Sequence, residues 1–512
     1  MMNRLEDELK TWLSSAPQSL ERLDLTSRVE HIGTVTRVGD NVASIAGLPQ
    51  TRLGELLRFE DGTRGLALSI DQASLDCVLL GAGDTIAAGM RVNGTGDVAS
   101  VPVGPDLLGR VVDALGEPID GGPKIRAERY DPMERPAPAI MERDLITEPL
   151  MTGLTVVDAM IPLGRGQRAL LLGDRQTGKT AMAVDTVINQ RSSDVICVYV
   201  LIGQKTSTIK QVIEAVRRYG AFERCVFVVG KASVTPGTQW LAPYAACTIA
   251  EYFRDKGQHA LLVLDDLTKH AIAYRQISLL LRRPPGREAY PGDIFYIHSR
   301  LLERAAKLSS DRGGGSLTAL PIVETQAGNL SAFIPTNLIS ITDGQIYFES
   351  KLFYEGQKPA VNVGLSVSRV GSKTQAPIIK AASSHLKLDY AQFVELEVFT
   401  RFGAMVDERT KKRIRHGRRI RQTLSQPQFS PRSIALQAAL LMALKEGRLD
   451  SLEHQQVETF KEDLATWLSK NCQKIMERVD REGDLAHEDQ QSLLDTIDDF
   501  VATLSSSGPA ED

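Results

Sequence analysis

The sequence predicts an α/β protein with a parallel sheet covered by helices on both faces, a small β-barrel before it and a helical domain after it. Apolar runs alternate with helical patterns from residue 169 to residue 266, as in sheets that are buried on both faces. Short β-like segments with frequent turns occupy residues 28 to 95, which is typical of a small barrel. Helical patterns dominate beyond about residue 375. We expect four parts: an amphipathic helix over 1–26, the barrel over 27–95, the sheet domain over 96–375 and the helical domain over 376–512.

The composition is that of an ordinary soluble protein. Of the 512 residues, 42% are hydrophobic and 24% are charged, and the formal net charge of −4 argues against a chain that coats nucleic acid. Five scattered cysteines, an odd number, indicate buried thiols in a reducing compartment. The N-terminus lacks a secretion signal, and no apolar run approaches the roughly 20 residues that span a bilayer. We therefore expect a cytoplasmic protein that can still dock on a membrane complex.

Four apolar residues recur at helical spacing near the N-terminus, at Leu5, Leu9, Trp12 and Leu13, with charged residues between them. This spacing predicts a short amphipathic helix with a narrow apolar stripe. Two interpretations stay open: the helix caps its own domain, or it binds a partner protein.

The predicted barrel contains a single aromatic residue, Phe59. A barrel that binds single-stranded RNA stacks bases on several aromatic side chains, so this region does not favour RNA binding. Residues 102–145 are rich in glycine and proline, which is typical of a connector that wraps a surface.

A phosphate-binding loop lies between a predicted strand and a predicted helix. The pattern GxxxxGK[ST] is matched by Gly173, Asp174, Arg175, Gln176, Thr177, Gly178, Lys179 and Thr180. An apolar run precedes it and a helical pattern follows it, which is the context that a nucleotide-phosphate site requires. Backbone N–H groups of such a loop converge on phosphate oxygens, Lys179 adds a full positive charge, and the Thr180 hydroxyl can bind Mg²⁺.

Two further strand ends complete the predicted nucleotide site. The apolar run over 260–264 ends in Asp265, an acid placed where phosphate-loop proteins hold Mg²⁺. The strand that ends near residue 202 leads to Gln204, where hydrolytic enzymes of this kind place a carboxylate. An amide can orient water but cannot take its proton. If Gln204 occupies that place, we expect the site to bind nucleotide with Mg²⁺ and to turn it over slowly or not at all.

Arg369 lies among small residues near the end of the predicted sheet domain. One hypothesis is that it serves a neighbouring subunit as an arginine finger, which stabilises transition-state charge at a γ-phosphate. The alternative is a structural ion pair.

Charge is distributed unevenly near the C-terminus. Residues 401–421 hold nine Lys or Arg against Asp407 and Glu408, whereas 481–512 hold nine acids against Arg481. The basic segment is either a solvated helix balanced by an acidic tail or a docking surface for an acidic partner.

Several motifs together resemble the alpha subunit of F-type ATP synthases, whose sheet domain is RecA-like. The resemblance covers nearly the whole chain. It rests on GDRQTGKT over 173–180, GQK over 203–205, YRQISLLLRRPPGRE over 274–288, SITDGQ over 340–345 and PAVNVGLSVS over 359–368. GDRQTGKT together with GQK distinguishes alpha subunits from the catalytic beta subunits of the same complex.

The resemblance implies a non-catalytic Mg-ATP site that uses Arg175, Gln176, Lys179, Thr180 and Asp265. It implies that Phe353, Gln426 and Gln428 line the adenine pocket. It also implies that Arg369 is an arginine finger, which faces the catalytic site of beta together with Ser340 and Ser366. ATP or ADP and Mg²⁺ are the implied cofactors.

The implied assembly is a hexamer of alternating alpha and beta subunits around the central-stalk gamma subunit, without nucleic acid, on the cytoplasmic face of the bacterial inner membrane. It makes ATP from ADP and phosphate with a transmembrane proton or sodium gradient, and the N-terminal helix meets the peripheral stalk.

Two departures from the family pattern are evident. Lys358 stands where family members commonly have an arginine near the adenine, and the charged segments 401–421 and 481–512 resemble the divergent second ATP synthases of some bacteria. Two alternative functions share the sheet domain: a homohexameric RNA translocase of the transcription-terminator type and a secretion-type ATPase. Both require a carboxylate at position 204.

Overall fold

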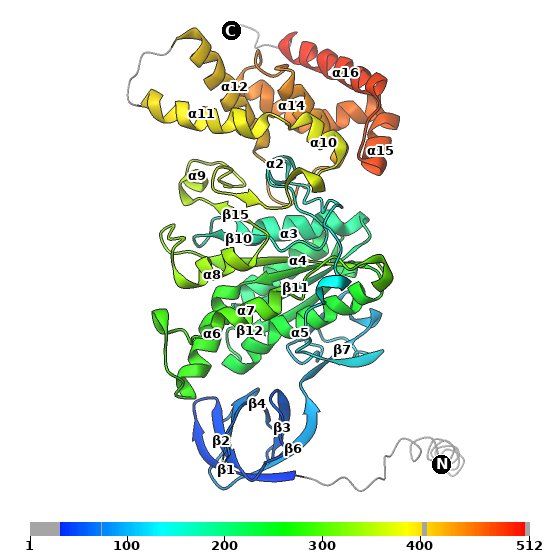
Figure 1. Ribbon diagram of the computed structural model, residues 1–512. Helices are drawn as coiled ribbons and strands as arrows, with labels where there is room; N and C mark the ends of the chain where they lie inside the picture. The colour runs from blue at the N-terminus through cyan, green and yellow to red at the C-terminus, as the bar shows by residue number, and fades with distance from the viewer. Residues whose placement is uncertain (1–30, 73, 402–406, 507–512) are drawn as a thin grey trace, which may run out of the picture.

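The computed structural model describes residues 31–72, 74–401 and 407–506. Figure 1 shows three stacked parts: a β-barrel at one end, an α/β sheet domain in the middle and a helical domain at the other end. This arrangement confirms the predicted fold class. The predicted N-terminal helix over 1–26 lies outside the described residues.

The first part is a closed barrel with the strand order β1-β2-β5-β4-β3-β6. Its interior is filled by apolar side chains that alternate along the strands, and Ile45 and Leu57 have no exposed surface. The strands are β1 (His31–Gly39), β2 (Val42–Ala46), β3 (Glu55–Phe59), β4 (Arg64–Ile70), β5 (Leu75–Leu79) and β6 (Arg91–Val98).

The middle part is built on an eight-stranded sheet with the order β16-β15-β10-β14-β13-β11-β12-β8. All neighbouring strands are parallel except β15 and β16. The strands are β8 (Arg110–Asp113), β10 (Leu170–Gly173), β11 (Val195–Gln204), β12 (Cys225–Lys231), β13 (His259–Asp265), β14 (Ser316–Glu324), β15 (Gly344–Phe348) and β16 (Val367–Ser368).

Helices cover both faces of this sheet. Tyr199 and Leu201 of β11 belong to one hydrophobic core, whereas Val198 and Val200 belong to the other. The first core includes side chains of α3 and α4, and the second includes those of α5, α6 and α7. The helices are α2 (Thr155–Met160), α3 (Lys179–Asn189), α4 (Thr206–Arg218), α5 (Pro236–Asp255), α6 (Leu267–Leu280), α7 (Ile294–Leu302), α8 (Phe333–Ile341) and α9 (Ser350–Tyr354).

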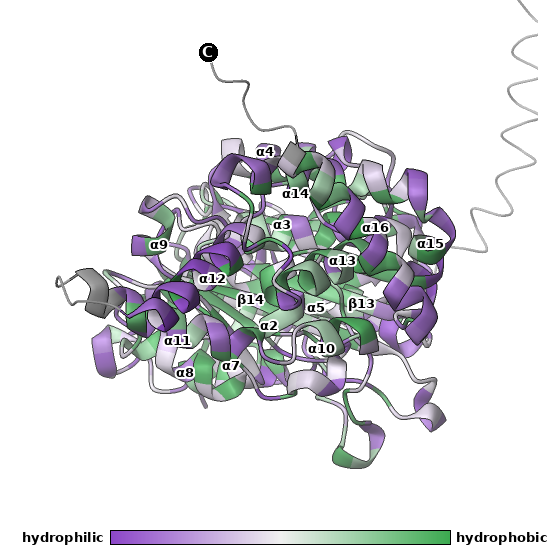
Figure 2. Cartoon of the chain, turned by 90° about the horizontal axis from the view of Figure 1, so that it is seen from above, coloured by the Kyte–Doolittle hydropathy of each residue, from purple (hydrophilic) through white to green (hydrophobic). Residues whose placement is uncertain are grey.

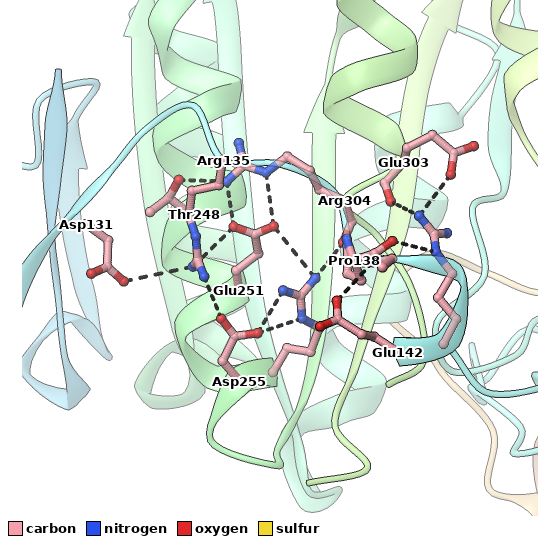
Figure 3. A network of polar contacts seen from close by, with 12 residues as sticks. Asp131, Arg135, Pro138, Glu142, Thr248, Glu251, Asp255, Glu303 and Arg304 are labelled. Carbon is pink, nitrogen blue, oxygen red and sulfur yellow. Dashed lines mark hydrogen bonds and ion pairs between the residues drawn. The ribbon is translucent and has the colours of Figure 1, made fainter. Parts of the chain in front are cut away.

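A buried ionic network fastens the glycine- and proline-rich connector to the sheet domain (Figure 3). The Arg304 guanidinium donates to Glu251 on α5 at 2.6 Å and to the Met133 carbonyl oxygen at 2.7 Å. Arg135 pairs with Asp255 at 2.9 Å. The connector also contributes β9 (Arg129–Pro132), which pairs with β7 (Ser100–Val103). Arg304 and Glu251 are buried and paired, so they fix the path of the connector at Met133.

The third part is a helical domain around α13, whose Ala438, Leu440 and Leu441 are buried. Its helices are α10 (Pro377–Ala382), α11 (Leu386–Arg401), α12 (Glu408–Leu424), α13 (Ile434–Lys445), α14 (His454–Asn471), α15 (Gln473–Glu482) and α16 (His487–Ser506). Figure 2 shows that α12 is mostly hydrophilic.

The cysteines and the helices bear on two expectations from composition. All five cysteines are free and buried, which confirms the prediction of buried thiols. Among the residues that the structure describes, no helix is both long enough and apolar enough to cross a membrane.

Candidate nucleotide site

The phosphate loop joins the end of β10 to the start of α3. Gly178 has a φ of 100° and directly precedes the helix, a backbone conformation that favours glycine. The Lys179 ammonium folds back over the loop and donates to the carbonyl oxygens of Gly173 at 2.7 Å and Asp174 at 2.5 Å. Burial lowers the pKa of Lys179. The lysine is therefore held over the loop, where a phosphate group would accept its hydrogen bonds.

Asp265 lies opposite Thr180, across the start of α3. The Thr180 hydroxyl donates to the Asp265 carboxylate at 2.9 Å, and the Tyr199 hydroxyl donates to the same carboxylate oxygen at 3.0 Å. Burial raises the pKa of Asp265. A hydroxyl beside a carboxylate is an oxygen-donor set of the kind that Mg²⁺ prefers, so Thr180 and Asp265 fit this ion. When bound with nucleotide, Mg²⁺ neutralises phosphate charge.

Gln204 lies at the end of β11, the strand that pairs with β13. Its amide nitrogen donates to Asp265 at 3.1 Å, and its amide oxygen accepts from the Lys269 ammonium at 2.8 Å. The structure thus brings Gln204 beside the predicted magnesium ligand. The neutral Gln204 side chain therefore lies between the Asp265 carboxylate and the Lys269 ammonium.

Two further side chains of the loop, those of Arg175 and Asp174, bind other residues of the same chain. Arg175, which is 77% exposed, pairs with Glu324 at the end of β14 at 2.7 Å. The Asp174 carboxylate accepts hydrogen bonds from Thr325 at 2.7 Å and from Ser350 at 2.9 Å. Asp174 therefore anchors the loop to the segment after β14 and to the start of α9.

The predicted adenine-pocket residues are divided between exposed and buried positions. Phe353 is half-buried, and the Lys358 ammonium lies 5.4 Å from the centre of its ring. Gln428 is exposed. Gln426, in contrast, is 3% exposed, and its amide nitrogen donates to the carbonyl oxygens of Gly153 at 2.8 Å and Ser430 at 2.7 Å.

The amide oxygen of Gln426 is occupied as well, because it accepts from the Thr155 N–H at 3.2 Å. Both ends of this side chain thus join the helical domain to the sheet domain. An adenine contact from Gln426 would have to replace one of these bonds.

A buried acid links the loop helix to the same region. Asp185 on α3 accepts a hydrogen bond from the Phe429 N–H at 2.6 Å. Burial raises the pKa of Asp185 to about 6. The Phe429 ring stacks on Tyr219 with 5.2 Å between ring centres. Because α3 begins at the phosphate loop, this contact connects the candidate nucleotide site to the helical domain.

Arg369 follows β16, the edge strand of the sheet, and its side chain is exposed. Its backbone N–H donates to the Asp343 carbonyl oxygen at 2.9 Å, and Arg168 forms a bidentate pair with the Asp343 carboxylate. Among the described residues, no carboxylate lies within ion-pair distance of the Arg369 guanidinium. Within the described part of the chain, Arg369 therefore makes no structural ion pair, and its side chain is exposed.

Ser340 and Ser366, which the resemblance groups with Arg369, lie in different environments. Ser340 is exposed near the end of α8, and its hydroxyl donates to the Asn337 carbonyl oxygen at 2.7 Å. Ser366 is 1% exposed; its hydroxyl donates to the Asn362 carbonyl oxygen at 2.6 Å and accepts from the Tyr347 N–H at 2.9 Å. Ser366 thus fixes the turn before β16 from a buried position.

Three residues of the site were not predicted from the sequence: Tyr199, Lys269 and Glu324. Glu324 ends an apolar strand beside the loop strand, a signal that could have identified it. Tyr199 lies inside an apolar run, and Lys269 lies in the first turn of α6, so the sequence around each of them does not reveal its partner.

The fold and this site define a nucleotide-binding protein of the phosphate-loop class. The chain belongs to the ATP synthase alpha/beta family. Its family profiles match residues 28–96 as the beta-barrel domain, 153–368 as the nucleotide-binding domain and 375–500 as the C-terminal domain.

Curated relatives agree with this assignment and confirm the resemblance to alpha subunits. The chain is 51% identical over 500 residues to ATP synthase subunit alpha 2 of Gluconobacter oxydans (strain 621H), covering 98% of this chain and 99% of the relative. It is 57% identical over 441 residues to ATP synthase subunit alpha 3 of Paraburkholderia xenovorans (strain LB400), covering 86% and 83%.

Proposed function

We propose that this chain is a non-catalytic subunit of a rotary ATP synthase, whose own site holds Mg-ATP and whose catalytic contribution is Arg369, offered to a neighbouring beta subunit. The observation that supports a non-catalytic site is the position of Gln204 between Lys269 and Asp265. A carboxylate there could take a proton from an attacking water, and an amide cannot.

The exposed guanidinium of Arg369 supports the proposal that this arginine serves a neighbouring beta subunit. An arginine that enters a neighbouring phosphate site must be free of carboxylates in its own chain and must stand on a fixed backbone. Among the described residues no carboxylate lies within ion-pair distance of the Arg369 guanidinium, and the Arg369 N–H is anchored to the Asp343 carbonyl oxygen. Ser340 is exposed and can lie at the same interface, whereas the buried Ser366 acts by holding the turn.

The proposed assembly is an alternating hexamer of alpha and beta subunits around gamma, on the cytoplasmic face of a bacterial membrane. It couples ATP synthesis to a transmembrane proton or sodium gradient. The support for it is the name that the relatives share, ATP synthase subunit alpha. The N-terminal segment over 1–26 is the proposed contact with the peripheral stalk.

The two alternative functions have less support. An RNA translocase would need aromatic side chains in the barrel, where Phe59 is buried and therefore cannot stack on a base. A secretion-type ATPase would need a carboxylate at the position of Gln204.

The experiment that tests the proposal measures binding and hydrolysis of ATP by the purified chain alone in the same sample. We expect saturable Mg-ATP binding, with bound ATP recovered intact and turnover far below the roughly 1–1000 s⁻¹ of working enzymes. Turnover in that range, or hydrolysis that RNA stimulates, would refute a non-catalytic site.

A further inference from the structure

A basic groove opens between α12 and the chain after α9. Its volume is about 1110 Å³, and we name it the arginine groove for Arg415, Arg418 and Arg419 of α12, which line it together with Lys411, Gln357 and Gln422. None of the phosphate-loop residues lines it. Figure 2 shows the hydrophilic helix α12 near α9.

Two of the arginines lack a partner. Among the described residues, no carboxylate lies within ion-pair distance of Arg415 or Arg418. Other cations on the same helix are neutralised: Lys411 pairs with Glu408 at 2.7 Å, and Arg421 pairs with Glu397 at 2.7 Å. Within the described ranges, Arg415 and Arg418 therefore carry positive charge that no ion pair compensates.

Three side chains that line the groove also carry a buried polar atom without a hydrogen-bond partner. The Nε atoms of Arg419 and Arg421 are buried without a hydrogen bond, and so is the amide oxygen of Gln357, a residue that is 9% exposed. Such atoms are rare in folded proteins, and each one left unpaired is costly. The terminal nitrogen of Arg419 is held by Gln422 at 3.0 Å, so this side chain is already oriented.

Two acids, Glu355 and Glu458, line the groove together with five Lys and Arg side chains of α12. Glu458 accepts from Lys461 at 2.8 Å and from Gln422 at 2.9 Å. Glu355 also has a polar partner within the chain. His454 is exposed and adds no negative charge.

We propose that the arginine groove binds an oligophosphate anion, at a site separate from the phosphate loop. Planar guanidinium groups form bidentate hydrogen bonds with phosphate oxygens, which is why arginine rather than lysine favours this ligand. The volume is comparable to the roughly 300–1000 Å³ of small-molecule pockets. Inorganic tripolyphosphate and the triphosphate of a nucleotide share this chemistry. The inference does not depend on the proposed function.

The test uses the full chain with Lys179→Gln, which weakens phosphate binding at the loop. Tripolyphosphate is titrated by calorimetry at fixed ionic strength into this protein and into two further variants that carry two extra substitutions each. The groove variant is Arg415→Gln with Arg418→Gln. The matched control is Lys412→Gln with Arg413→Gln, which removes two exposed charges from the same helix outside the groove.

We expect the groove variant to lose affinity by at least about tenfold, because two charge-assisted interactions disappear. The control should change by less than about twofold, because exposed charges are screened by salt. Equal weakening in both variants, or no saturable binding to the Lys179→Gln chain, would overturn the proposal.

A parallel titration with ATP distinguishes the two sources of phosphate. Tighter binding of ATP than of tripolyphosphate, lost in the groove variant, indicates a nucleotide; equal or weaker binding indicates the inorganic anion. Melting temperatures of all variants, measured by circular dichroism, show whether each is folded.

Discussion

The Lys269 ammonium donates a hydrogen bond to the Gln204 amide oxygen at 2.8 Å. This bond fixes the orientation of the amide, so that its nitrogen points to Asp265. The side chain that would have to activate water is thereby engaged with a cation on one side and with the predicted magnesium ligand on the other. Hydrolysis requires a group at position 204 that takes a proton from water, whereas nucleotide binding does not.

Replacing Gln204 by Glu should not create a hydrolytic site. The new carboxylate would lie beside both the Lys269 ammonium and the Asp265 carboxylate, which shift its pKa in opposite directions. A hydrolytic phosphate site also needs an arginine from a neighbouring subunit to stabilise the transition state, and the purified chain alone has no such neighbour. We expect phosphate release by the purified Gln204→Glu chain to stay at the wild-type level. Turnover of about 1 s⁻¹ or faster, the lower end for working enzymes, would show that the amide alone prevents hydrolysis.

Replacing Asp265 by Asn should weaken the preference for Mg-ATP over free ATP. The substitution removes the charge that the Thr180 hydroxyl faces at 2.9 Å. Loss of one charged oxygen ligand should reduce Mg-ATP affinity by about tenfold to a hundredfold. Titration with and without EDTA measures the effect. Wild-type affinity should fall in EDTA, whereas the affinity of the variant should change little; an equal EDTA effect in both would exclude Asp265 as a ligand.

The buried Asp185 should make stability depend on pH. Its folded-state pKa, raised by burial to about 6, lies above the ordinary value, so the protonated form favours folding and this stabilisation is lost as pH rises through about 6. Asp185→Asn keeps an oxygen that can accept from the Phe429 N–H and removes the charge.

We expect Asp185→Asn to raise the free energy of unfolding by about 1–3 kcal/mol near pH 8 and to change it little near pH 4. Urea denaturation at both pH values, with wild type in parallel, measures the difference. A variant that is less stable than wild type near pH 8 would show that the carboxylate is ionised and stabilising.

Local patterns were sufficient to predict the architecture and the proximity of the phosphate loop to Asp265. The apolar run before Gly173 and the acid after the run over 260–264 place the loop and Asp265 on strands of one parallel sheet, because parallel strands end at the same edge. Gln204 could be placed at the same edge of the sheet, because the apolar run of its strand ends near residue 202.

The partners of distant side chains could not be predicted. Arg175 was expected to serve nucleotide, yet it pairs with Glu324, which is 149 positions away. Gln426 was expected in the adenine pocket, yet its amide is occupied by the backbone of residues 153–155 and Ser430. Whether an amide faces a ligand or the protein depends on how two domains pack, and no local pattern records that packing.

The most direct test of the account is the effect of Arg369→Ala in a hexamer reconstituted with the beta subunit. We expect nucleotide binding to be retained and multisite ATP hydrolysis to fall by roughly 10³ to 10⁵, the range known for arginine fingers. Arg369→Lys keeps the charge without the planar fork and should recover only part of the rate. Near-normal turnover by the Arg369→Ala hexamer would contradict the proposal that this chain contributes an arginine to its neighbour.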